Sequence, residues 1–157
     1  MKILFFGDVF GRPGREALSK ALSRMISQTQ TDFVIANVEN ACHGNGILPE
    51  MAHDLINQGV DVLTTGNHVW DQKQITTFMS SSHRLIRPAN YPDHPAYRVP
   101  GRGATVVESR RKPGLRLGVV QVMGRVFMDA IDCPFRAADT EIYRLDELEV
   151  QCIVVDF

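Results

Sequence analysis

The chain has 157 residues, 17 Lys and Arg against 18 Asp and Glu, and a hydrophobic share of 44%. This length and composition predict one globular domain, 1–157. The formal charge of −1 does not indicate a protein held to nucleic acid by bulk positive charge. No apolar run approaches the roughly 18–20 residues that span a bilayer, and the N-terminus lacks a signal-peptide pattern. We therefore expect no membrane partner.

The cysteines carry information about the compartment. Cys42, Cys133 and Cys152 are odd in number, far apart in the sequence and without a CxxC pair. This pattern favours free thiols over a disulfide framework or a zinc site. We therefore predict a cytoplasmic location.

The first half of the chain alternates strand-like and helix-like segments. Pro13 and Pro49 suit the first positions of two helices, and Gly59 suits a helix C-cap. The apolar patterns predict strands at 2–6, 33–36 and 60–65, with helices at 13–29, 49–58 and about 71–79. Short connections between alternating strands and helices indicate an α/β fold with a mostly parallel sheet.

The second half of the chain has a different pattern. Four prolines between 84 and 103 predict an extended loop. Strands at 105–108 and 115–122 flank a Lys-Pro-Gly turn at 112–114, which predicts an antiparallel hairpin. We expect a helix at 134–148 and a last strand at 152–155. The basic run at 110–112 is interpreted as a solvated turn.

Polar side chains follow each of the first three predicted strands. Asp8 follows the first strand, Glu39 and Asn40 follow the second, and Asn67 and His68 follow the third. Ligands of open α/β sheets bind beyond the carboxyl ends of the strands, so these five residues should meet at one edge. Carboxylate, amide and imidazole donors suit Mn, Fe or Mg.

Each cluster alone is explained more simply by residues that form turns or cap helices, but the three clusters together favour a metal site. The other histidines are interpreted as structural or solvated side chains: His43, His53, His83 and His94.

Three other motifs fit poorly. In a dinucleotide fingerprint Asp8 would repel the pyrophosphate, although Glu39 would suit a ribose contact. A P-loop needs Gly-Lys-Ser/Thr, which is absent. An aspartyl-nucleophile phosphatase would normally carry a second Asp where this chain has Phe10. A nucleotide-binding α/β module therefore rests on Glu39 and the sheet alone.

The triplet 66–68, Gly-Asn-His, resembles the GNH motif of calcineurin-like metallophosphoesterases. Two parts of that pattern are missing: Phe10 replaces a histidine, and Asn-Val-Glu-Asn at 37–40 replaces the GDxxD block. These departures resemble the YmdB-like bacterial branch of the superfamily. The segments that carry this resemblance lie at 7–15, 87–92, 100–103 and 124–128, and the similarity covers essentially the whole chain.

The resemblance implies a calcineurin-like phosphoesterase sandwich, in which helices cover mixed β-sheets. It implies a phosphodiesterase that hydrolyses 2′,3′- or 3′,5′-cyclic nucleotides through two divalent ions (Fe or Mn, with Mg a further candidate) and a metal-bound hydroxide. Asp8 and Asn40 would bind one metal, Glu39 would bridge both, and Asn67 would bind the second. His68 would donate a proton to the leaving oxygen. The expected partner is a small phosphodiester, and a homo-oligomer remains open.

In the family, further metal-binding histidines follow the strand that here ends at Phe157. The resemblance therefore implies an N-terminal part of a family member, incomplete at the C-terminus. We expect residues 1–157 alone to be a poor or inactive catalyst. The alternative function is a non-catalytic truncated fragment or a regulatory or RNA-associated binding protein.

Overall fold

The computed structural model describes residues 1–93, 96 and 98–157. His94, which was interpreted as a structural or solvated side chain, and part of the predicted proline-rich loop therefore lie outside the described residues. The helices are α1 (Gly11–Thr29), α2 (Pro49–Gln58), the 3₁₀ helix η1 (Asn67–Trp70), α3 (Ile75–Ser81) and α4 (Pro134–Asp146). The strands are β1 (Ile3–Phe6), β2 (Phe33–Asn37), β3 (Val62–Thr64), β4 (Leu85–Ile86), β5 (Ala104–Glu108), β6 (Arg116–Gln121) and β7 (Cys152–Asp156).

The strands form two sheets. The first sheet has the order β1-β2-β3-β4, and all its paired neighbours are parallel. The second has the order β5-β6-β7, in which β5 and β6 are antiparallel and β6 and β7 are parallel. The predicted parallel sheet, the hairpin and the mixed α/β class are confirmed.

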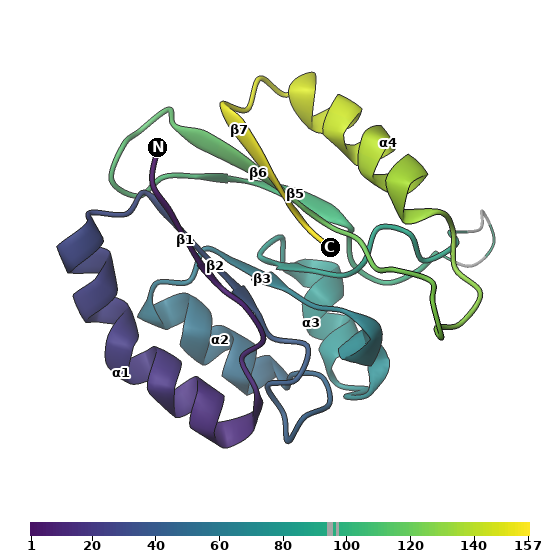
Figure 1. The fold of residues 1–157 in the computed structure, drawn as a ribbon, viewed down its shortest axis with the longest axis horizontal. Helices are drawn as coiled ribbons and strands as arrows, with labels where there is room; N and C mark the ends of the chain where they lie inside the picture. Colours follow the sequence, from purple (N-terminus) through teal and green to yellow (C-terminus); the bar gives the residue numbers. More distant parts are fainter. Residues whose placement is uncertain (94–95, 97) are drawn as a thin grey trace.

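The two sheets and the helices make four layers (Figure 1). Along β2, Phe33 and Ile35 pack in the cluster between the two sheets, while Val34 and Ala36 pack among the helices α1, α2 and α3. Helix α4 covers the outer face of the second sheet through Leu145. Burial of β2 on both faces explains why its sequence is a continuous apolar run rather than an alternating one.

Several predicted boundaries shift. The helix expected at about 71–79 is α3, which begins later, at Ile75, and ends at Ser81; the 3₁₀ helix η1 precedes it in the segment expected to be loop. A two-residue strand, β4, extends the parallel sheet inside the segment predicted to be loop. Gly59 is the C-cap of α2, as predicted, with φ +117 and its N–H bonded to the Ile56 carbonyl.

The basic run at 110–112 lies in an exposed turn, as predicted, but its side chains also pair with acidic residues of the first sheet. Arg110 pairs with the buried Asp61 at 3.3 Å, and Lys112 pairs with the buried Asp32 at 3.0 Å. Arg111 donates to the Thr31 carbonyl. The turn of the β5–β6 hairpin therefore binds acidic residues beside the amino ends of β2 and β3, and this attaches the second sheet to the first.

All three cysteines are free thiols, as predicted. Among the described residues, no helix is both long and apolar enough to cross a bilayer.

Candidate metal centre

The carboxyl ends of β1, β2 and β3 lie at one edge of the parallel sheet, and the loops that leave this edge are joined by backbone hydrogen bonds. Val9 N–H donates to the Asn37 carbonyl at 2.9 Å, and Gly11 N–H donates to the Asn40 carbonyl at 2.8 Å. Val38 N–H donates to the Thr64 carbonyl at 2.9 Å. These bonds fix the positions of the residues that follow the three strands.

Asp8 and Asn40 are in direct contact. Asn40 Nδ2 donates to Asp8 Oδ1 at 2.6 Å, although the two residues are 32 positions apart. Asp8 has φ +40, in the left-handed region that Asp tolerates better than most residues. A pocket of about 320 Å³ between β1 and α1 reaches Asp8. The first predicted pair of ligands is thus together in space.

Glu39 is half-buried among charged neighbours. Burial, followed by the negative charges of Asp8 and Asp156, raises the pKa of the Glu39 carboxyl. The charge of His68 and a hydrogen bond from the Asn67 backbone N–H oppose this rise. Glu39 therefore interacts with three of the other four predicted residues, and its carboxylate lies in a locally negative environment.

Gly66 makes room for this carboxylate. A Cβ atom built on Gly66 would overlap the Glu39 side chain. Gly66 has φ −170, which any residue adopts. The glycine is therefore needed for space beside Glu39 and not for an unusual backbone conformation.

Asn67 and His68 begin η1. Asn67 contributes its backbone N–H to Glu39, and the His68 ring contacts Asp71, with Nδ1 and Oδ2 2.7 Å apart. The structure thus brings all five predicted residues to one edge of the sheet, whereas their roles as ligands or proton donor stay predictions.

Sequence reasoning missed two acidic residues here. Asp156 ends β7, and its Oδ2 accepts hydrogen bonds from Thr64 Oγ1 at 2.5 Å and from Asn37 Nδ2 at 3.1 Å. Asp71 contacts His68. The Asp71 contact could have been suspected from its spacing of three residues, but nothing local in the sequence places Asp156 beside residues of β2 and β3.

The edge holds oxygen donors of the kind that divalent ions bind. In the part of the chain that the structure describes, no three His, Cys, Asp or Glu side chains are arranged to hold a metal ion. The candidate set is different, because two of its four proposed ligands, Asn40 and Asn67, are amides. Negative charge around Glu39 and neutral amide oxygens beside it fit a hard or borderline cation.

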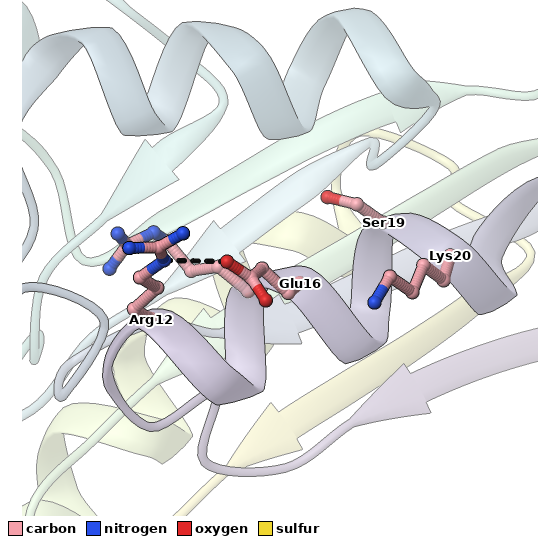
Figure 2. Close-up of a pocket in the computed structure, with 5 residues that line it drawn as sticks. Arg12, Glu16, Ser19 and Lys20 are labelled. Atoms are coloured by element: carbon pink, nitrogen blue, oxygen red, sulfur yellow. Dashed lines mark hydrogen bonds and ion pairs between the residues drawn. The ribbon is translucent and has the colours of Figure 1, made fainter.

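A separate pocket of about 330 Å³ lies on the outer face of α1 (Figure 2). Its lining includes Arg12 and Glu16, which form an ion pair at 2.6 Å. None of the candidate ligands lines it. Arg12 is largely exposed, so the pair resembles the weak ion pairs that are common on protein surfaces.

Two sheets thus pack between helices, and acidic and amide side chains gather at the carboxyl edge of the parallel sheet. The family model for "YmdB-like protein" matches residues 4–157, and the chain belongs to this family.

The comparisons with single proteins agree with this family. The chain is 40% identical over 139 residues to a "2′,3′-cyclic-nucleotide 2′-phosphodiesterase" of Bacillus subtilis (strain 168); the match covers 88% of this chain and 50% of the relative. A crystal structure of a hypothetical protein from Thermus thermophilus is 39% identical, with a TM-score of 0.83, covering 99% of this chain and 56% of that one.

A crystal structure of a phosphatase from Mycoplasma pneumoniae is 29% identical, with a TM-score of 0.84, covering 100% of this chain and 54% of that one. The chain therefore spans about half the length of the relatives it matches.

Proposed function

We propose that this chain carries the nucleotide-phosphodiester hydrolysis site of a metal-dependent phosphodiesterase. The observation that carries the proposal is the convergence of Asp8, Glu39 and the two amide residues at one sheet edge, with His68 beside them. The relative named for 2′,3′-cyclic-nucleotide 2′-phosphodiesterase activity supports the same reaction class. Cyclic 2′,3′- and 3′,5′-diesters are the substrates proposed.

Two divalent ions, Fe or Mn, or else Mg, are the proposed cofactors. Asp8 and Asn40 would hold one ion, Asn67 the other, and Glu39 would contact both. When bound, such ions neutralise charge on the phosphoryl oxygens and make an attacking water more acidic. The raised pKa of Glu39 supports this assignment. Burial and the neighbouring carboxylates disfavour the ionised form of its side chain, and a bound cation would stabilise that form.

The chain's own residues supply positioning and proton transfer. The loops joined by the Val9–Asn37 and Gly11–Asn40 hydrogen bonds hold the oxygen donors in place before a substrate arrives. His68 is the proposed proton donor to the leaving oxygen, a role typically worth about 10²–10⁴-fold in rate. A cytoplasmic location, a small-molecule substrate and a homo-oligomer belong to the same proposal.

A non-catalytic binding protein is the second candidate. One observation favours it: two of the four proposed metal ligands, Asn40 and Asn67, are neutral amides. With amides as half of its donors, the site would bind ions weakly and without the charge that catalysis needs.

The two functions are separated by measuring Mn²⁺ binding by calorimetry and Mn²⁺-dependent hydrolysis of bis-p-nitrophenyl phosphate by residues 1–157. The phosphodiesterase proposal expects Mn²⁺ binding and a slow, Mn²⁺-dependent hydrolysis by residues 1–157, each abolished by chelation and by Glu39→Ala. Mn²⁺ binding without hydrolysis would favour the binding protein. Hydrolysis that survives chelation would contradict the proposed metal dependence.

A further inference from the structure

The His68 ring is held from one side by an acidic residue of the same 3₁₀ turn. Nδ1 of His68 lies 2.7 Å from Oδ2 of Asp71, and both side chains are partly exposed, at 34% and 41%. The Asp71 backbone N–H also donates to the His68 carbonyl, at 3.2 Å. The two residues are therefore joined through both main chain and side chain.

The 3₁₀ conformation explains why these two residues meet. In a 3₁₀ helix the side chains at i and i+3 eclipse one another, whereas in an α-helix they are offset. An α-helical turn over the same residues would therefore align the pair less directly.

Contacts on both sides fix the turn in place. Asn67 N–H bonds to Glu39, Val69 is buried, and Gln72 Nε2 donates to the Asn45 carbonyl at 2.8 Å. Trp70 packs edge-to-face against Tyr91, with ring centroids 5.4 Å apart. The position of Asp71 relative to His68 is thus set by the surrounding fold.

We propose that Asp71 is a positioning residue for His68: it keeps a hydrogen on Nδ1 and presents Nε2 to the reacting phosphodiester. This rests on the proposed function. In hydrolysis, water forms a new P–O bond while the bond to the leaving oxygen breaks. Nε2 of the doubly protonated ring gives its proton to that oxygen and leaves a neutral ring with its hydrogen on Nδ1; the proton of the attacking water passes to solvent, which later reprotonates Nε2.

The alternative is a surface ion pair without consequence for the ring. Exposed pairs contribute about 0–1 kcal/mol to stability, so thermal unfolding cannot distinguish the two. The tautomer of the neutral His68 ring does distinguish the two interpretations. A carboxylate that accepts a hydrogen bond from Nδ1 favours the tautomer with hydrogen on that nitrogen. An unsupported imidazole side chain prefers the hydrogen on Nε2.

The test uses residues 1–157 labelled with ¹⁵N-histidine and long-range ¹H–¹⁵N correlation spectra of the neutral rings; His68→Ala assigns the signal. We expect the Nδ1–H form of His68 to dominate in the wild-type chain and in Asp71→Glu, and the Nε2–H form in Asp71→Ala. Asp139→Asn, an exposed acid on α4, is the matched control and should leave the spectrum unchanged. A His68 tautomer that is the same in wild type and Asp71→Ala would overturn the proposal.

Kinetics with two diesters, measured on a full-length relative that carries the same His68–Asp71 pair, separate this inference from the function on which it rests. Asp71→Ala should slow a cyclic nucleotide, whose leaving group is an alkoxide, by about 10-fold or more, since that group needs a proton. It should slow bis-p-nitrophenyl phosphate far less, because p-nitrophenolate leaves unaided. Equal slowing of both diesters would contradict positioning for proton donation. A full-length relative that hydrolyses neither diester would reject the proposed function, and the spectra of residues 1–157 would still decide the role of Asp71 in holding the ring.

Discussion

Asp156, the last residue of β7, accepts a hydrogen bond from Thr64, the last residue of β3, at 2.5 Å. The two residues belong to different sheets and are 92 positions apart. Asn37, at the end of β2, donates to the same oxygen at 3.1 Å. One carboxylate thus connects the second sheet to the edge of the first, beside Glu39.

This contact should contribute measurably to stability. Thr64 is fully buried, and Thr64→Val keeps its shape while removing the donated hydrogen bond. Because the acceptor is a carboxylate, we expect a loss of about 1–3 kcal/mol in the free energy of unfolding, measured by urea denaturation. Thr140→Val, which removes an exposed hydroxyl on α4, is the control and should cost less than about 0.5 kcal/mol. Equal losses in both variants would show that the Asp156 contact adds nothing.

Gly66→Ala should destabilise the chain through a steric clash with Glu39. We expect a cost of about 1–3 kcal/mol in the free energy of unfolding, as for other overpacked sites. In a Glu39→Ala background the cost should fall by about 1 kcal/mol or more, a coupling that a double-mutant cycle measures. Gly7→Ala is the control, because a Cβ there meets no atom within 4 Å. A cost that is independent of Glu39 would place its cause in the backbone.

Glu39→Ala and His68→Ala should separate metal binding from proton transfer. Loss of the proposed bridging carboxylate should abolish Mn²⁺ binding measured by calorimetry. In a full-length relative, loss of the proposed acid should leave Mn²⁺ binding nearly intact and lower the turnover of a cyclic nucleotide by about 10²–10⁴-fold. If both variants lost metal equally, the assignment of their roles would be wrong.

Lys112 should make stability depend on pH in the acid range. Hydrogen bonds from Lys112 and from the Lys2 backbone lower the pKa of Asp32. The unfolded chain therefore binds a proton at a higher pH than the folded chain does. The stabilisation is present above about pH 4, the ordinary range of the unfolded carboxyl, and is lost as pH falls through the lower, folded pKa.

Lys112→Met should flatten this acid limb of the stability profile, measured by urea denaturation between about pH 2 and pH 6. Asp61, whose pKa burial raises, contributes with the opposite sign but equally in both proteins. Lys73→Met, an exposed lysine before α3, serves as the control. A profile as steep in Lys112→Met as in the wild-type chain would argue that the Lys112–Asp32 pair has no role in stability.

The sequence alone determined the features that depend on neighbours along the chain. The apolar runs of β2 and β6 and the caps Pro49 and Gly59 are local signals, since strand pattern and helix ends are fixed within a few residues. The placement of Asp8, Glu39 and Asn67 at one edge also followed from sequence, because parallel strands carry their carboxyl ends to the same side.

Only the tertiary structure decided the contacts that join distant segments. The basic run at 110–112 has the composition of a solvated turn, and its acidic partners Asp32 and Asp61 are dozens of residues away. Asp156 ends an ordinary apolar strand, yet packing of the second sheet on the first brings its carboxylate to Thr64. The reason is physical: charge pairing and hydrogen bonding act over a few ångströms in space, and separation along the chain does not reveal which groups the packed layers bring within that range.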